Sequence, residues 1–308
     1  MQRLNAPIGQ QLRSWRKRRQ LSQLELSMAA DVSTRHLCFV ENGRAHPGRD
    51  LILSLATELD VPLRDRNALL MTAGFAPVFR HHRFDDPSFD SVRSIITVTL
   101  ETHKPFPAYV VDRHWNVVAS NAAVPELFEG VAPELLLPPI NVVRMILHPR
   151  GIAPRLSNYA AWRRHYVTQL RRQIEQTRDP IQEELYNEAI SYPGHGSEMA
   201  ANDERTEGPA IKFEVMTKLG LLSFLSATTV FGSPTDVTLE EIALEMLYPA
   251  DAFTAQVVRD SVKSAPERSN KQPASASDVV GYRSRANTLS RGRASEKCDL
   301  SGEALSKK

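Results

Sequence analysis

The sequence predicts an α+β protein with two domains: an all-α bundle of five helices, then a mixed α/β domain, followed by a disordered basic tail. Three observations indicate this fold class. Helical periodicity continues to about residue 77, β-rich runs then alternate with helical segments, and the final stretch is poor in large apolar residues. The predicted boundaries are 1–77 for the bundle, 78–90 for a linker, 91–262 for the mixed domain and 263–308 for the tail.

The first helix is predicted over residues 8–20, because Ile8, Leu12 and Trp15 recur at helical spacing. Its other side is strongly basic, which suits either a solvated face or contact with phosphates. The basic residues are Arg13, Arg16, Lys17, Arg18 and Arg19.

Two short amphipathic runs joined by a tight turn follow, in the stretch LSQLELSMAADVSTRHLCFVENGRAHPGR from Leu21 to Arg49. Ser22 and Glu25 have the spacing of a capping box for the first run, and Ser33 can cap the second. The expected inner faces are Leu24, Met28 and Ala29 in the first run, and Leu37 and Val40 in the second.

This stretch resembles the helix-turn-helix of the XRE (Cro/repressor-like) family of DNA-binding regulators. The residues that carry the resemblance are Ser22-Gln23, Leu26, Ala30, Val32-Ser33, Leu37, Val40-Glu41, Asn42-Gly43-Arg44 and Pro47. The chain departs from the family pattern at Asp31, where the turn usually has glycine, and at Ser27, where alanine is usual. Aspartate tolerates positive φ, so the turn can still form. The resemblance implies binding to double-stranded DNA and an ion pair between Arg16 and Glu41.

A short helix that projects polar side chains fits the major groove. Thr34, Arg35 and Phe39 are therefore expected at base edges or thymine methyl groups, although Phe39 could instead belong to the bundle core. Helix N-termini and arginines suit phosphates. The expected DNA-binding residues are Gln23, Ser33, Thr34, Arg35, Phe39, Arg44 and Arg49.

Two more helices complete the bundle. The fourth is marked by Leu51, Leu55 and Leu59, with Asp50 as its expected cap, and the fifth covers residues 63–73. The linker that follows is polar and contains a solvated histidine pair, His81-His82, without a third residue at metal-ligand spacing.

The mixed domain is predicted to begin with a helix at about residues 88–103. Two β-rich runs, 108–112 and 115–120, are separated by a turn, and a later pair forms a hairpin around Gly220. The remaining expectations are helices at 122–128, 141–147, 158–177 and 180–192, an exposed loop at 194–208, hairpin strands at 211–217 and 221–230, and a short helix or strand connection at 238–246.

Four phrases in this part of the chain resemble the MmyB-like ligand-binding domain family, in which an XRE head precedes a PAS-like regulatory domain. They are GFAP at 74–77, FPAYVVDRHWNVVASN at 106–121, PPINVVRMILHP at 138–149 and WRRH at 162–165. The resemblance extends from about Gly9 to Val258. It implies a PAS-like sensor with an apolar cavity between sheet and helices.

The expected ligand is small and apolar, perhaps acyl-like in structure, although aromatic and aliphatic residues at these spacings can also fill a core. The alternative is a second domain that recruits a protein partner without a small-molecule ligand. The expected pocket residues are Tyr109, Val111, Trp115, Met145, Leu147, Trp162, Tyr166, Phe213 and Phe224, with Val117 and Leu225 as further candidates.

Charge and motifs exclude several other classes. Residues 1–83 carry 13 Lys/Arg against 7 Asp/Glu, whereas residues 84–262 carry 15 against 24, so only the first part suits a polyanion. Cys38 and Cys298 fit no disulfide framework or metal spacing, and no run suits a signal peptide or a membrane helix, so the cytoplasm is expected. Catalytic and cofactor motifs are absent from the sequence, so the protein is expected to be no enzyme, to need no cofactor or metal, and to bind DNA as a homodimer.

Overall fold

Short capped helices form the first part of the computed structural model, which describes residues 6–124, 129–194 and 210–264. Here and below, residues 6–77 are called the head and residues 90–264 the body. The five helices of the head are α1 (Ile8–Arg18), α2 (Gln23–Ala29), α3 (Thr34–Glu41), α4 (Arg49–Glu58) and α5 (Leu63–Thr72). The predicted fold class, a helical bundle followed by an α/β domain, is confirmed.

Local sequence signals explain the helix boundaries in the head. Ser22 and Glu25 form the capping box of α2, with nitrogen–oxygen distances of 2.7 and 3.1 Å. Asp31 closes the turn between α2 and α3 with a φ of 50°, a conformation that aspartate tolerates. The predicted cap of α4 was wrong: Gly48 occupies the N-cap position, and Asp50 lies in the first turn of the helix.

The predicted inner face of α2 was also wrong. Leu24 and Met28 are 58% and 74% exposed, and Leu26 and Ser27 are buried instead. Leu24 and Met28 lie one helical turn apart and so share a face, and Leu26 projects about 200° further around the helix from Leu24. The inner residues predicted for α3, Leu37 and Val40, are buried in the head core.

The body contains one antiparallel sheet with the strand order β2-β1-β5-β4-β3. Its central strand comes from residues 243–249, where the sequence predicted a short helix or a connection. The elements are α6 (Asp90–Thr102), β1 (Ala108–Val111), β2 (Val117–Ser120), α8 (Val142–Leu147), α9 (Tyr159–Thr177), α10 (Pro180–Ser191), β3 (Lys212–Thr217), β4 (Gly220–Thr229), α11 (Val237–Glu240), β5 (Ala243–Pro249) and α12 (Ala252–Ser264).

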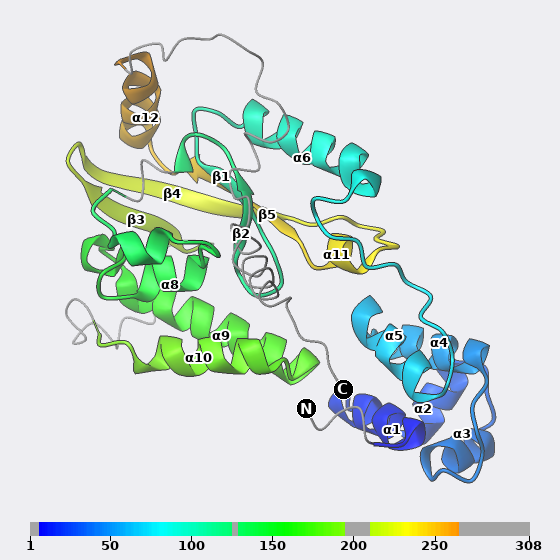
Figure 1. The fold of residues 1–308 in the computed structure, drawn as a ribbon. Coiled ribbons are helices and arrows are strands. Elements are labelled where there is room, and N and C mark those ends of the chain that lie inside the picture. Colours follow the sequence, from blue (N-terminus) through cyan, green and yellow to red (C-terminus); the bar gives the residue numbers. More distant parts are fainter. Residues whose placement is uncertain (1–5, 125–128, 195–209, 265–308) are drawn as a thin grey trace, which may run out of the picture.

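Side chains alternate between the two faces of a strand, so each face of this sheet packs against a different set of helices. Val110 and Leu244 belong to a core cluster with Ile96 and Leu100 of α6, on the face where Figure 1 shows α6. Residues of the opposite parity, such as Val111, join a larger cluster with α8, α9 and α10 on the other face. Helices therefore cover both faces of the sheet. The candidate ligand site, described below, lies between the sheet and the larger helical layer.

Three sequence predictions fall wholly or largely outside the described residues: most of the helix at 122–128, the loop at 194–208 and the tail from residue 265 onward. The tail was predicted to begin at residue 263, but α12 continues to Ser264. Within the described part of the chain, no helix has both the length and the apolar character needed to cross a membrane.

Candidate functional site

The second helix of the helix-turn-helix presents polar groups to solvent. Ser33 caps α3 by accepting a hydrogen bond from the His36 amide at 3.2 Å. Thr34 and Arg35 are exposed at the first turn. Phe39 is half-buried and lies outside the head core cluster, with the Arg35 guanidinium 5.4 Å from its ring centre. This edge of α3 therefore combines a cation, a hydroxyl and an aromatic ring.

Arg44 and Arg49 follow α3 in the sequence: Arg44 lies in the loop after this helix, and Arg49 is the first residue of α4. Both are exposed, and neither forms an ion pair within the described residues. The Arg44 amide donates to the Phe39 carbonyl at 2.8 Å, and Gly43 has a φ of 72°, so the loop turns tightly after the helix. Two cations are thus held beside α3 with their charges available.

An ion pair inside the head joins α1 to α3. The Arg16 guanidinium donates two hydrogen bonds to the Glu41 carboxylate, at 2.6 and 2.8 Å, and Gln23 donates a third at 2.7 Å. Burial alone would raise the pKa of Glu41, but these hydrogen bonds and the Arg16 charge outweigh it, so the pKa lies below its ordinary value. Gln23, expected at a phosphate, thus also positions this pair at the start of α2.

The remaining basic residues of α1 divide into two groups. The Arg18 guanidinium lies 4.0 Å from the Trp15 ring centre, and Arg19 donates to the Leu59 carbonyl at 2.8 Å. Arg13 and Lys17 are exposed and form no ion pair with the described residues. Only part of this basic face is therefore free for phosphate contact.

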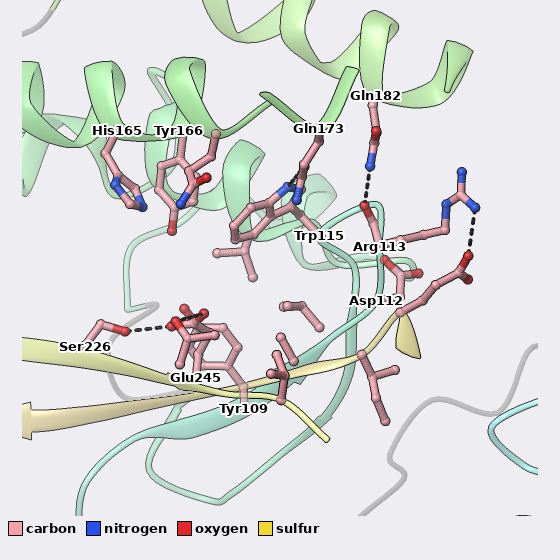
Figure 2. A pocket seen from close by; sticks show the side chains of 18 of the residues that line it. Tyr109, Asp112, Arg113, Trp115, His165, Tyr166, Gln173, Gln182, Ser226 and Glu245 are labelled. Atoms are coloured by element: carbon pink, nitrogen blue, oxygen red, sulfur yellow. Dashed lines mark hydrogen bonds and ion pairs between the residues drawn. The ribbon is translucent and has the colours of Figure 1, made fainter. Parts of the chain in front are cut away.

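The body contains a cavity of about 660 Å³ between the sheet and the helices α8 and α9. Figure 2 shows Tyr166 and His165 of α9 facing Tyr109 and Glu245 of the sheet across this space. Residues predicted for the pocket that lie on its wall are Tyr109, Val111, Trp115, Val117, Met145, Trp162, Tyr166 and Phe213.

Leu147 and Phe224 were predicted to line the pocket, but both are fully buried in the surrounding core. Phe224 shares the strand face of Ser226 and Thr228, which do line the cavity, and lies further along β4 beside its strand partner Phe213. Leu225 points to the opposite face and is 36% exposed. The alternation of residues in the sequence predicted the correct face of the sheet, but it could not predict where along each strand the cavity ends.

A constrained turn places Trp115 in the cavity wall. Trp115 has a φ of 66°, in the left-handed region that a bulky residue rarely adopts. Asp112 holds the turn by accepting from the amides of His114 and Asn116, at 2.8 and 2.9 Å. The Trp115 indole donates to the Gln173 side chain of α9 at 3.0 Å, which fixes the ring against the helical layer.

Three titratable groups of the cavity are held neutral. Burial raises the pKa of the Tyr109 and Tyr166 hydroxyls, and the charge of Glu245 adds to both shifts. Burial and the nearby Arg172 lower the pKa of His165, which favours its uncharged form. The aromatic part of the cavity therefore contains no cation from these residues at neutral pH.

One end of the cavity is walled by residues of both domains, including Arg64 of α5 and Glu241 beyond α11. The Arg64 guanidinium donates to the Glu241 carboxylate at 2.7 and 2.8 Å, and the Leu63 amide donates to Glu240 at 2.8 Å. Arg113, from the turn before Trp115, also donates to Glu241 at 2.9 Å and pairs with Asp179. We call Arg64, Arg113, Asp179, Glu240 and Glu241 the junction cluster.

The linker is bound to both domains. The Asn67 side chain of α5 contacts the backbone of Val78 and Phe79 at 2.7 to 3.0 Å. His82 was predicted to be solvated, but its Nδ1 lies 2.7 Å from the Asp236 carboxylate at the start of α11. Head movement relative to the body would therefore disturb contacts at both ends of the linker.

Sequence reasoning missed the acidic residues of these sites, Asp236, Glu240, Glu241 and Glu245. Strand register could have indicated Glu245, because it pairs with Tyr109 across β1 and β5, but this required recognising β5. Within the described residues, no group of three or more His, Cys, Asp or Glu is placed to hold a metal ion.

The fold and the two sites define a class: a DNA-binding transcription regulator with a helix-turn-helix head and a separate regulatory body. Residues 12–65 match the helix-turn-helix family, and residues 92–260 match the MmyB-like transcription regulator ligand binding domain. The second match covers more than half of the chain, so the protein belongs to the MmyB-like transcription regulators. A search of curated proteins finds no match to the chain. Both matched families are regulator domains rather than enzymes.

Proposed function

We propose that α3 reads an operator in the major groove and that the body senses a small, largely apolar, acyl-like ligand. The observation that carries the DNA-reading part is the exposed edge of α3. Arg35, Thr34 and Phe39 lie there, and Arg44 and Arg49, in the loop after α3 and at the start of α4, have no ion-pair partner in the part of the chain that the structure describes. Arginine suits guanine N7 and O6, and flanking cations suit phosphates.

The cavity favours a sensing body over one that only recruits a protein partner. A volume of about 660 Å³ is within the range of small-molecule sites, and aromatic and aliphatic side chains form much of its wall. Nothing in the matched families points to a reaction, and we propose that the body has no catalytic role. The protein would act in the cytoplasm, where its DNA is.

We propose that the junction cluster couples the two sites. A ligand that fills the cavity would contact the wall formed by the Trp115 turn, and Arg113 of that turn shares Glu241 with Arg64 of the head. Ligand would then favour one arrangement of the head over another. A single small head gives modest affinity, so we further propose a homodimer on half-sites about 10 base pairs apart or a multiple of that.

Selection of DNA from a random pool by the full chain tests the reading role. We expect one enriched motif, and Arg35→Ala should relax it at one position and cost about 1–3 kcal/mol there. Arg83→Ala is the control, because Arg83 lies in the linker and pairs only with Asp85 among the described residues. An unchanged motif for Arg35→Ala would contradict the assigned role of that residue.

A second experiment separates ligand sensing from partner recruitment. Thermal unfolding of the full chain should shift upward with at least one apolar metabolite fraction of a cell extract, because a ligand that binds only the folded state stabilises it. Arg64→Ala should weaken the effect of the fraction on DNA affinity much more than it reduces that shift, because Arg64 lies at one end of the cavity and joins the head to Glu241. If no fraction shifts unfolding, the recruitment alternative is favoured.

A further inference from the structure

The polar group at the middle of the cavity wall is a carboxylate. Glu245 lies on the central strand β5, opposite Tyr109 on β1 and Thr228 on β4 in the sheet register. All three line the cavity, so one row across the sheet presents a phenol, a carboxylate and a hydroxyl to the same space. Figure 2 shows Glu245 beside Tyr109 and joined to Ser226.

The hydrogen bonds to Glu245 come from hydroxyl groups and bring no opposite charge to its carboxylate. Ser226 and Thr228 donate one hydrogen bond to each carboxylate oxygen, at 2.6 and 2.7 Å. No Lys, Arg or His among the described residues forms an ion pair with Glu245. An ionised carboxylate has acceptor sites for about four hydrogen bonds, so two remain for a donor in the cavity.

Aromatic rings line the cavity from α9, from the turn at Trp115 and from strand β3. Trp115 and Tyr166 pack edge to face with ring centres 5.3 Å apart, and Trp162 and Phe213 do the same at 5.5 Å. Tyr109 and Tyr166 make no hydroxyl hydrogen bond within the described residues, so both phenols can accept from a bound group. Aromatic rings with a nearby carboxylate form the environment that attracts an organic cation.

At the other charged end of the cavity, each arginine among the described residues already has a partner. Arg64 is paired with Glu241, and Arg113 is shared between Glu241 and Asp179. Arg19 donates to the Leu59 carbonyl and pairs with Asp60. A ligand carboxylate near Glu245 would meet a like charge, which disfavours an anion at this place. The cavity therefore discriminates by charge as well as by apolarity.

We propose that the ligand is an amphiphilic amine whose ammonium group binds Glu245 between Tyr109 and Tyr166. Its apolar chain lies along the aromatic and aliphatic wall formed by Trp115, Met145 and Phe213. This inference rests on the proposed ligand-sensing function and keeps its largely apolar ligand, but it assigns an ammonium group to that ligand in place of an acyl-like one.

The test is calorimetric titration of the full chain at neutral pH with three probes of equal chain length: octylamine, octan-1-ol and octanoate. Octylamine should bind at least about tenfold more tightly than octanoate, because it gains a charge-assisted hydrogen bond that octanoate replaces with repulsion. Octan-1-ol should fall between them. Octanoate binding as tightly as octylamine would overturn the proposal.

Two variants assign this preference to its residue. Glu245→Gln should weaken octylamine binding by about tenfold or more and change octan-1-ol binding much less, because only the amine uses the charge. Glu214→Gln is the matched control: Glu214 lies on β3 of the same sheet, also accepts a serine hydroxyl, from Ser157 at 2.8 Å, and does not line the cavity. An unchanged amine-to-alcohol ratio in Glu245→Gln would overturn the proposal.

The three probes also distinguish a failure of the amine proposal from a failure of the ligand-sensing proposal. Binding of octan-1-ol or octanoate without octylamine would refute the amine and leave ligand sensing intact. Absence of heat and of any thermal shift with all three probes would contradict both. The wild-type ratio of amine to carboxylate affinity decides the question even if Glu245→Gln fails to fold.

Discussion

In the head, the buried carboxylate of Glu41 meets Arg16 and Gln23, which satisfy it from two helices. In the body, the donors that Glu245 meets among the described residues are hydroxyl groups, and it faces a cavity of about 660 Å³. The buried ion pair between Arg16 and Glu41 fixes α1 against α3. This contrast indicates that the head is a rigid DNA-binding unit, whereas the body keeps an open space that can bind a ligand.

The largest expected effect is the loss of head stability when the ion pair between Arg16 and Glu41 is broken. Arg16→Met leaves the buried Glu41 without its cation and should destabilise the head by about 3–5 kcal/mol. Hydrogen exchange of peptides from residues 6–77 in the full chain measures this loss. Arg13→Met, at an exposed site on the same helix, should change exchange by less than about 0.5 kcal/mol.

The same ion pair makes the stability of the head depend on pH in the acidic range. The folded-state pKa of Glu41 lies below its ordinary value of 4.5, so the stabilisation is present above pH 4.5 and is lost as pH falls through the folded pKa. The protection factors of the head amides, which correct for the intrinsic pH dependence of exchange, should therefore fall below pH 4.5. Arg16→Met should not show this extra loss of protection, because burial then raises the pKa of Glu41 instead.

Truncating one side chain in the head core and one on the cavity wall of the body tests whether the two interiors differ in the stability that each side chain contributes. Leu55→Ala, at a fully buried head position, should cost about 2–5 kcal/mol because it leaves a new void. Val117→Ala, on the cavity wall, should cost about 1 kcal/mol because it enlarges an existing space. Denaturant unfolding of each variant gives the two values, and equal costs would contradict the contrast.

DNA contacts should separate specificity from general affinity. Arg44→Ala removes an unpaired cation and should weaken binding to all sequences alike, reducing the salt slope by about 1 for each head. Arg35→Ala should alter base preference with a smaller change in slope. Binding assays at several salt concentrations, on selected and scrambled duplexes, distinguish the two outcomes.

The smallest effect concerns turn residues in left-handed conformations. Asp31 in the head and Arg178 in the body have φ values of 50° and 51° at helix ends. Glycine at either position should stabilise its own domain by about 0.5 kcal/mol, since relief of strain exceeds the added entropy of the unfolded chain. Domain-resolved hydrogen exchange would detect each change separately.

These differences also explain what could be predicted from sequence. The head helices were found because caps such as Ser22 and Ser33 act locally, and the hairpin was found around Gly220. The central strand β5 was missed because its approach, LEEIALEML from residue 239 to 247, consists mostly of strong helix formers. Pairing with β1 and β4 on both sides overrides that propensity.

The candidate sites follow the same division. Exposed residues on α3 could be predicted because helical periodicity places them, and most aromatic residues of the cavity wall were on the predicted side of the sheet. Glu245 and the junction cluster could not be predicted, because their roles depend on residues far apart in the chain. Glu241, for example, meets Arg64 and Arg113 from separate elements.

The central claim is that the head binds duplex DNA through a salt-sensitive groove contact at α3. The most direct measurement is the affinity of the full chain for its selected duplex between about 50 and 200 mM salt. If Arg44 and Arg49 of two heads each contact a phosphate, affinity should fall by about a hundredfold over this range. An affinity that does not change with salt, or no binding to any duplex, would contradict the claim.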